Sequence, residues 1–319
     1  MSSGSASLPD ALLDRTVVGS YTRLGYALRS PHWDESELRR MDGEVVIVTG
    51  ATSGLGEAAA TGFARLGATV WLVVRNAERG ERSRAAIAER SGSDQLLVAV
   101  CDLSEMRSVR RFAAEFAERS PRLDVLVNNA GVLTPERSLS ADGIELTLAT
   151  NVLGPFLLTK LLVGPLEASA PSRVINVSSG GMYTQGLHLD DLQSTEGRFR
   201  GAVAYSRSKR IEVVLTELWA LRLQGTGVVV NSMHPGWVDT PGLRESLPGF
   251  HKLMRPLLRT VRQGADTIVW LGAASPAAEV SGGFWLDHAQ RPKHLLPWSG
   301  ESDADRERLW EQVERLAGV

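Results

Sequence analysis

Short apolar runs rich in β-branched residues alternate with longer helical stretches along most of this chain. Seven runs predict strands, at residues 44–49, 69–74, 96–101, 124–127, 173–177, 228–232 and 283–286. Nearly continuous apolar runs are typical of strands that are covered on both faces. Helical stretches separate them, for example at 55–66, 78–90, 104–119 and 204–223. The alternation predicts βαβ units with right-handed crossovers, and hence an α/β fold around one parallel sheet.

Two tails lie outside this alternation. A chain of 319 residues can form one large domain or two small ones. Neither tail looks long enough for a domain of its own. We therefore predict one domain at 42–287, with an N-terminal helical extension at 1–41 and a C-terminal extension at 288–319.

Composition argues against several classes of protein. The net charge of −2 gives no basic excess, so we expect no nucleic-acid partner. Cys101 is the single cysteine, which rules out an intrachain disulfide and fits a reducing compartment. No apolar run approaches the roughly 18–20 residues of a membrane span, and no secretory signal is evident at the N-terminus. We expect a cytoplasmic protein without a metal, because the histidines show no ligand spacing.

A glycine-rich turn joins the first predicted strand to the first helix. Such a junction presents backbone N–H groups and the positive end of a helix to an anion such as a pyrophosphate. The spacing is G-x-x-x-G-x-G, and a purely structural glycine turn is the alternative. The residues predicted to bind a dinucleotide here are Gly50, Thr52, Ser53, Gly54, Leu55 and Gly56.

The end of the second strand decides which dinucleotide binds. A carboxylate there would favour NAD(H), but this chain has Arg75 and no acid, and a guanidinium can pair with a 2′-phosphate. We predict NADP(H) in preference to NAD(H); a solvated surface arginine is the alternative. Further cofactor contacts are predicted after the third and fourth strands, at Asp102, Leu103, Asn129, Ala130 and Gly131. By itself Asp102 could equally be a helix cap.

Tyr205 and Lys209 begin a long helical stretch and are four residues apart, so they share one face. A free tyrosine has a pKa near 10, and an ammonium beside it favours the phenolate that a base needs. Ser179 follows the fifth strand and could bind a substrate oxygen, with its neighbour Ser178 as the alternative. Asn151 lies four residues before Pro155, whose missing N–H would free the Asn151 carbonyl to hold a water. Proline also kinks a helix, and the alternative is that the Asn151 side chain only compensates for this kink.

The segment after the sixth strand, His-Pro-Gly-Trp-Val-Asp-Thr at 234–240, offers a turn with backbone donors for the nicotinamide carboxamide. Considered alone, it is simply a turn. The residues predicted to contact the cofactor here are Pro235, Gly236, Val238 and Thr240.

In combination these motifs resemble the short-chain dehydrogenase/reductase family over roughly residues 42–287. The long segment between Ser179 and Tyr205 resembles the retinol-dehydrogenase-like branch. The resemblance implies a Rossmann-type, doubly wound sheet in the order 3-2-1-4-5-6-7. It also implies that Tyr205 is the general acid in reduction, Ser179 steadies the substrate oxygen, Lys209 binds the nicotinamide ribose, Asn151 supports a proton-relay water and Thr240 binds the nicotinamide end.

Substrate contacts are expected from residues 180–203 and 241–262. The second segment mixes apolar with basic residues, which favours a lipophilic carbonyl or alcohol substrate and would also suit a basic amphipathic helix at a membrane surface. Leu13, Val17, Tyr21, Leu24 and Leu28 likewise share one helical face, and packing on the protein's own core is the alternative for both segments. The sequence is compatible with peripheral membrane contact and with a homo-oligomer, and decides neither. A non-catalytic dinucleotide sensor or scaffold is the competing function.

Overall fold

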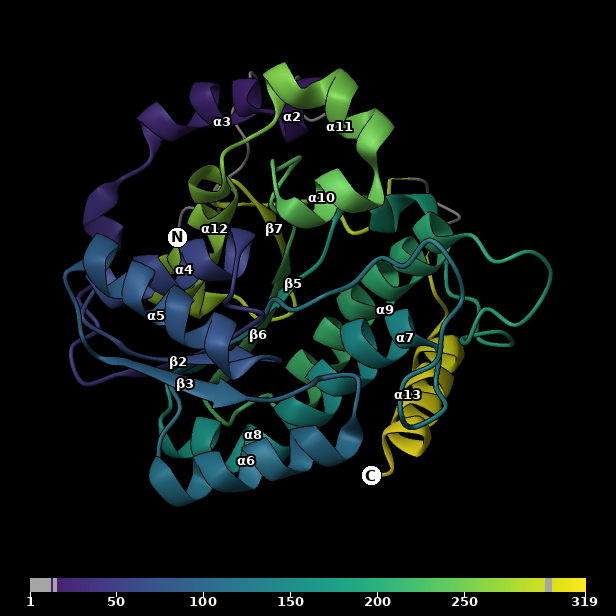
Figure 1. Cartoon of the computed structure of the whole chain (residues 1–319), viewed down its shortest axis with the longest axis horizontal. Helices are drawn as coiled ribbons and strands as arrows, with labels where there is room; N and C mark the ends of the chain where they lie inside the picture. The colour runs from purple at the N-terminus through teal and green to yellow at the C-terminus, as the bar shows by residue number, and fades with distance from the viewer. Residues whose placement is uncertain (1–12, 14–15, 296–299) are drawn as a thin grey trace.

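The computed structural model describes residues 13, 16–295 and 300–319, and places one continuous sheet at the centre of the molecule (Figure 1). Its strand order, β3-β2-β1-β4-β5-β6-β7-β8, confirms the predicted order of the first seven strands, which are parallel. The strands are β1 (Val45–Thr49), β2 (Thr69–Val74), β3 (Leu96–Val100), β4 (Val125–Asn128), β5 (Ser172–Val177), β6 (Val228–Met233), β7 (Phe284–Leu286) and β8 (Ala289–Gln290). β8, which the sequence did not predict, pairs antiparallel with β7.

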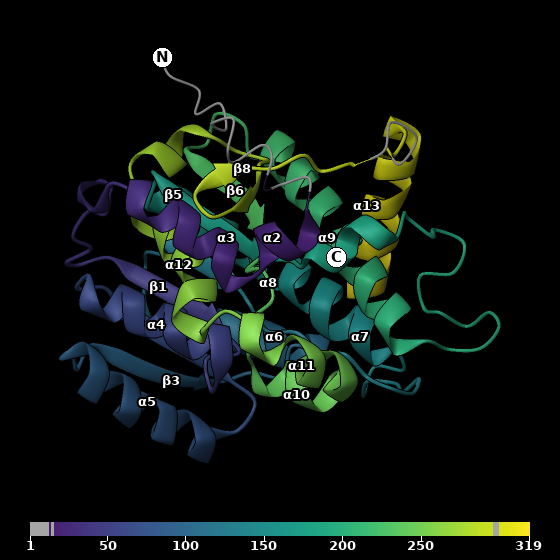
Figure 2. The same ribbon diagram turned by 90° about the horizontal axis from the view of Figure 1, so that it is seen from above.

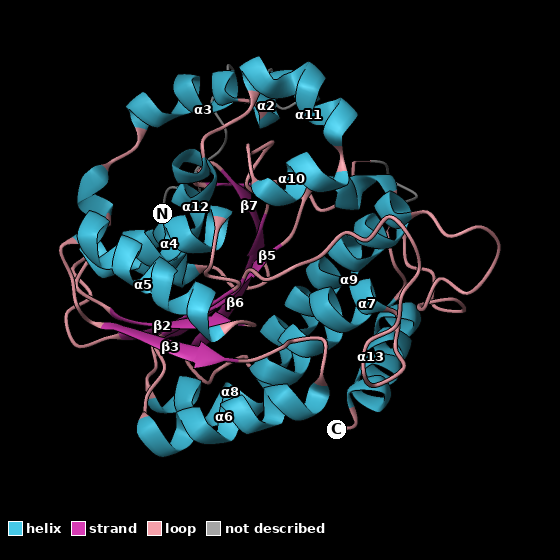
Figure 3. Ribbon diagram, viewed as in Figure 1, coloured by secondary structure: helices cyan, strands magenta, loops and turns pink. Residues whose placement is uncertain are grey.

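Helices cover both faces of the sheet, as Figure 3 shows. One face carries α4 (Gly54–Arg65), α5 (Ala77–Ser91) and α12 (Val261–Ala273), and the other carries α6 (Met106–Arg119), α8 (Gly154–Ala168) and α9 (Gly201–Arg222). Each face buries its own apolar cluster, because every parallel strand sends alternate side chains to opposite sides. The strand order reverses between β1 and β4, which places a ligand crevice at the carboxyl ends of these strands.

Helix α13 (Asp303–Ala317) in the C-terminal tail packs against α8 and α9 (Figure 1). Leu309 and Val313 are fully buried there, and the Trp310 ring meets the rings of Phe156 and Trp219. Ser302 caps the helix by accepting a hydrogen bond from the Asp305 N–H at 3.1 Å. The C-terminal tail therefore completes the core on this side of the sheet.

The N-terminal segment does not form the single amphipathic helix that its apolar spacing predicts. It forms α2 (Val17–Tyr21) and α3 (Arg23–Arg29), which are separated by the extended backbone of Thr22. Val17, Leu24 and Leu28 are 48%, 50% and 58% exposed, so most of the shared apolar face points outward and does not pack on the core. The buried residues of these two helices are Ser20, Gly25 and Arg29, so the segment docks through small and polar residues.

The prediction of one basic amphipathic helix within 241–262 is also wrong. The segment forms α10 (Pro241–Ser246), α11 (Pro248–Met254) and a 3-10 turn at Arg255–Leu257. Prolines at 248 and 256 interrupt it, since proline cannot donate a backbone hydrogen bond within a helix. Arg259, which the sequence grouped with the basic residues of this surface, is only 1% exposed and forms ion pairs with Asp287.

Candidate active site

The turn between β1 and α4 has the geometry that the glycine motif predicts. Gly50 has a φ of +68°, and a β-carbon built on it would lie 2.9 Å from the Ala130 Cα atom. A β-carbon on Gly56 would lie 2.4 Å from the Gly50 carbonyl oxygen, so only glycine permits this close approach of helix and strand. Residues 52–55 of the turn are partly exposed, and their backbone opens α4. The turn is therefore a cradle at a helix N-terminus that suits a pyrophosphate.

Asn129 supports this cradle from the neighbouring strand. Its side-chain amide donates to the Thr49 carbonyl at 2.8 Å, while the Thr49 hydroxyl accepts from the backbone N–H groups of Asn129 and Ala130 at 2.9 and 3.0 Å. These bonds join the segments that follow β1 and β4. Asn129 and Ala130 therefore lie beside the glycine turn, and the Asn129 side chain stabilises the turn itself.

The segment after β2 exposes Arg75, followed by Asn76, whose side chain caps α5 by accepting from the Arg79 N–H at 2.8 Å. A hollow of about 210 Å³ lies between the glycine turn and α5, and Thr52, Arg79 and Arg82 contribute to its lining. The sequence interpretation missed Arg79. The signal that could have identified it is its place in the first turn of the helix that follows Arg75.

Asp102 follows β3 and is not the cap of α6, because the N-cap position of that helix is Glu105. Its Oδ1 atom accepts hydrogen bonds from the backbone N–H of Ser104 at 2.9 Å and from its hydroxyl at 2.7 Å. One carboxylate oxygen is therefore engaged in a local turn before α6. Leu103 is 3% exposed, and its carbonyl oxygen packs against Gly154 so closely that a β-carbon there would lie 2.2 Å away.

Asn151 lies in a π-helical turn, Ala149–Leu153, between the short α7 (Leu146–Leu148) and α8. π-Turns within helices are common at functional sites. The Asn151 side chain is fully buried; it accepts from the Val132 N–H at 2.8 Å and donates to the Val132 carbonyl at 3.1 Å and to the Ser208 hydroxyl at 3.0 Å. It therefore joins the segment after β4 to α9.

Lys209 lies beneath the site and is 3% exposed. Its ammonium donates to the Val177 carbonyl at 2.9 Å and to Glu212 Oε1 at 2.7 Å, and lies 5.5 Å from the centroid of the partly exposed Tyr205 ring. Burial opposes the charge of Lys209, but the charges of Glu212 and Tyr205 and the hydrogen bond to Glu212 together outweigh it and raise the pKa of the lysine. Burial also raises the pKa of Glu212 to about 7, although the ammonium offsets part of that rise. The lysine remains a cation held at a defined position.

The two serines after β5 have different surroundings. Ser178 is buried and its hydroxyl donates to the Lys209 carbonyl at 2.8 Å, so it anchors β5 to α9. Ser179 is partly exposed, and its hydroxyl accepts from the Gly181 N–H at 3.2 Å. A hydroxyl that accepts this bond still has its own proton to donate. This geometry favours Ser179 over Ser178 as the group that meets a substrate.

The segment after β6 faces the glycine turn. A β-carbon built on Gly54 would lie 3.5 Å from the Thr240 Cγ2 atom, so Thr240 lies beside that turn while its hydroxyl caps α10. His234 at the start of this segment is 1% exposed. Burial, followed by the charge of Arg259, lowers its pKa to about 3, which keeps the imidazole neutral at physiological pH. His234 is therefore a packing residue here and not an acid or base.

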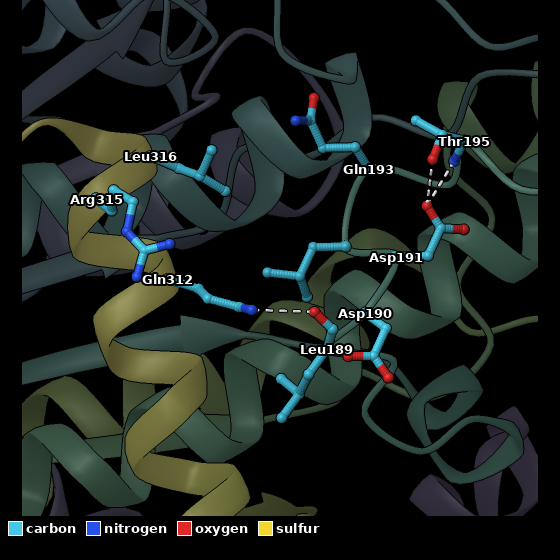
Figure 4. Close-up of a pocket in the computed structure, with 9 residues that line it drawn as sticks. Leu189, Asp190, Asp191, Gln193, Thr195, Gln312, Arg315 and Leu316 are labelled. Carbon is cyan, nitrogen blue, oxygen red and sulfur yellow. Dashed lines mark hydrogen bonds between the residues drawn. The ribbon is translucent and has the colours of Figure 1, made fainter.

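A separate hollow of about 260 Å³ lies between residues 189–195 and α13 (Figure 4). Leu189, Gln193 and Gln312 line it, and the Gln312 side chain donates to the Leu189 carbonyl at 3.1 Å. None of the catalytic or cofactor residues predicted from the sequence lines this hollow. We therefore place the candidate active site at the carboxyl ends of β1, β4, β5 and β6.

Comparisons with known proteins bear on this site. Residues 44–249 match the family described as short chain dehydrogenase. The chain belongs to the short-chain dehydrogenase family. It is thus an oxidoreductase that interconverts alcohols and carbonyl compounds on a fold that binds NAD(P). Among the described residues, no cluster of three potential metal ligands occurs and no helix is long and apolar enough to cross a membrane.

Curated relatives match most of the chain. "Dehydrogenase/reductase SDR family member 12" from Bos taurus is 43% identical and covers 93% of this chain and 94% of its own length. "Retinol dehydrogenase 12" from Homo sapiens is 37% identical and covers 88% of both chains. These likenesses confirm the predicted retinol-dehydrogenase-like branch.

Solved structures share the fold. An uncharacterised protein from Mycobacterium paratuberculosis has a TM-score of 0.72 at 27% identity and covers 90% of this chain and 98% of its own. A protein described as a NAD(P)-dependent gluconate 5-dehydrogenase from Beutenbergia cavernae, with bound NADP, has a TM-score of 0.63 at 28% identity. It covers 77% of this chain and 96% of its own.

Proposed function

We propose that this protein is an NADP(H)-dependent oxidoreductase of a lipophilic carbonyl or alcohol, with Tyr205 as the acid and base. The observation that carries the proposal is the convergence of Tyr205, Lys209 and the Ser179 turn at the sheet edge that also holds the glycine cradle. A protein that only senses a dinucleotide has no need to hold a phenol beside a buried ammonium.

Tyr205, Ser179 and Lys209 have separate roles in the reaction at the substrate oxygen. Tyr205 donates its phenol proton to that oxygen in reduction, and Ser179 donates a hydrogen bond to it. The Lys209 ammonium stabilises the negative charge that develops on the phenol oxygen, and its position beside the ring is fixed by Glu212 and the Val177 carbonyl. Asn151 keeps the segment after β4 against α9. Bound NADPH supplies the hydride.

Preference for NADP(H) is supported by the cations at the adenosine end of the cradle. Arg75 is exposed directly after β2, and Arg79 lines the hollow beside Thr52. Two guanidinium groups suit a 2′-phosphate, which accepts several charge-assisted hydrogen bonds. The structural neighbour from Beutenbergia cavernae, whose description includes bound NADP, is consistent with this choice.

Tyr205→Phe tests the proposal, because it removes one hydroxyl and keeps the ring. NADPH binding, followed by fluorescence titration, should persist, while turnover of a panel of lipophilic aldehydes and ketones should fall by about 100-fold or more, the scale of general acid catalysis. Tyr26→Phe is the matched control, since it also removes one phenol hydroxyl, and that hydroxyl donates to Asp266 instead of facing the proposed catalytic groups. Unchanged turnover in Tyr205→Phe refutes Tyr205 as the acid and favours the non-catalytic alternative.

Peripheral contact with a lipid surface is the second part of the proposal. Val17, Leu24 and Leu28 are exposed on α2 and α3, and Leu253 of α11 is 77% exposed; these helices lie at the same end of the molecule in Figure 1. Lys252 beside Leu253 is also exposed, which suits an anionic headgroup. Apolar patches rimmed by polar residues mark interaction sites.

Co-sedimentation with vesicles of phosphatidylcholine and phosphatidylserine tests this contact. The wild type should pellet with the vesicles, and the variant Val17→Ser/Leu24→Ser/Leu28→Ser should remain in the supernatant. Leu221→Ser is the matched control, because Leu221 is 63% exposed on α9. The absence of pelleting of the wild type refutes the membrane contact.

A further inference from the structure

The N-terminal segment reaches the two loops that frame the candidate active site. The backbone N–H of Trp237 donates to the Tyr21 carbonyl at 2.7 Å. A β-carbon built on Gly180 would lie 2.4 Å from the Tyr21 Cε2 atom, so the edge of the tyrosine ring lies directly against the residue that follows Ser179. Tyr21 therefore lies between the turn after β5 and the segment after β6, although it lies more than 150 residues earlier in the chain.

Further aromatic rings form a series of contacts that begins at Tyr21. Its ring centroid is 4.4 Å from that of His234 and 6.0 Å from that of Trp237, and the Trp237 ring meets Phe250 of α11 at 5.1 Å. Tyr21, Trp237 and Phe250 are all partly exposed. Such rings offer apolar area at little entropic cost, because their side chains have few rotatable bonds.

A buried ion-pair cluster holds this segment in place. Asp287 accepts from Arg259 at 2.6 and 2.7 Å and from Arg29 at 2.8 Å, and all three residues are at most 7% exposed. The same guanidinium groups donate to the Ser20 carbonyl at 2.8 and 3.2 Å, and Arg259 also donates to the Thr22 carbonyl at 3.2 Å. The backbone on both sides of Tyr21 is therefore fixed, as a binding wall requires. In Figure 2, α2 and α3 cross over this end of the sheet.

We propose that Tyr21 is a specificity-determining residue of the substrate site, where it forms with Trp237 and Phe250 an aromatic wall for the hydrocarbon part of the substrate. The inference rests on the proposed function, and it names the group that would recognise the lipophilic portion. The N-terminal extension is thereby a part of the site, and loss of the Tyr21 ring changes which carbonyl compounds are accepted.

The test compares Tyr21→Ala with the wild type on straight-chain aldehydes from propanal to decanal with NADPH. The kcat/KM for decanal should fall about tenfold or more, whereas that for propanal should change less than about twofold, because only the long chain reaches the wall. The KM for NADPH should stay constant. Tyr21→Phe should match the wild type, and Leu24→Ala, on the exposed face of the same segment, is the control.

A uniform loss at every chain length, or no loss at all, overturns the inference. If Tyr21→Ala fails to fold, Tyr21→Leu keeps part of the packing but removes the ring and much of its apolar area, so it should lower the decanal-to-propanal ratio by a smaller factor. Calorimetric titration of 1-decanol into the NADP⁺-saturated protein supplies a readout without turnover: Tyr21→Ala should weaken binding about tenfold, and equal binding overturns the proposal.

These outcomes separate the inference from the proposed function. Decanol binding that depends on Tyr21, in a protein that turns over no carbonyl, supports the wall and refutes the enzymatic role. Turnover of short aldehydes by a wild type that binds no decanol refutes the wall and leaves the enzymatic role intact.

Discussion

Asp287→Asn is expected to destabilise this protein strongly, although Asp287 lies outside the catalytic groups. Its carboxylate is 1% exposed and forms ion pairs with the guanidinium groups of both Arg29 and Arg259, which are 6% and 1% exposed. The variant removes the carboxylate that both buried guanidinium groups face. Removal of one partner from a buried ion pair costs about 3–5 kcal/mol of unfolding free energy. For a chain of 319 residues, that corresponds to a fall in Tm of about 4–7 °C.

Differential scanning calorimetry and urea unfolding at pH 7 measure this loss. Asp190→Asn is the matched control: its ion pair with Arg308 is solvent-exposed, so its stability should change by less than about 0.5 kcal/mol. Addition of Arg29→Gln to Asp287→Asn should cost less than the sum of the single changes, because both substitutions remove the same ion pair. A loss below about 1 kcal/mol in Asp287→Asn would refute the reasoning.

The pH dependence of this cluster follows from the pKa of Asp287. Burial opposes ionisation of the carboxyl group, but the hydrogen bonds and charges of Arg259 and Arg29 outweigh it and hold the pKa below its ordinary value. The stability that the cluster contributes is therefore complete above the ordinary pKa and is lost as the pH falls through the lower pKa of the folded state. Wild type and Asp287→Asn should consequently converge in stability under strongly acidic conditions.

Two further predictions concern cofactor choice and the buried lysine. Arg75→Glu should lower the ratio of kcat/KM for NADPH to that for NADH by about tenfold or more, since it replaces a partner of the 2′-phosphate with a like charge; Arg84→Glu on α5 is the control, and an unchanged ratio contradicts the role of Arg75. The pKa of Glu212 is raised to about 7 by burial, so its contribution to stability is present below the ordinary pKa and is lost as the pH rises through about 7. Glu212→Gln should therefore narrow the difference in urea midpoint between pH 5 and pH 8, and a difference as large as in the wild type would contradict this assignment.

Local patterns were enough to predict the sheet and the sheet edge at which the candidate site residues gather. A continuous apolar run between turns predicts a buried strand wherever it occurs, and βαβ handedness then restricts the strand order. The glycine spacing, the pair Tyr205 and Lys209 and the resemblance to the family identified the groups at the carboxyl ends of the strands. The sequence could not decide between Ser178 and Ser179, because their difference depends on the Lys209 carbonyl, which reaches β5 only when α9 packs on the sheet.

By itself, the sequence determined the elements whose physics is local: the strands, the glycine cradle and the helical spacing of the phenol and the ammonium. Only the tertiary structure decided how the N-terminal segment docks. Apolar periodicity left open whether the face with Val17 and Leu24 packs on the core; both are exposed, while Arg29 is buried against Asp287, 258 residues further along the chain. That contact is held by the attraction between opposite charges, which offsets the cost of removing them from water. The spacing of residues along the sequence does not specify which distant charged residue will lie opposite Arg29.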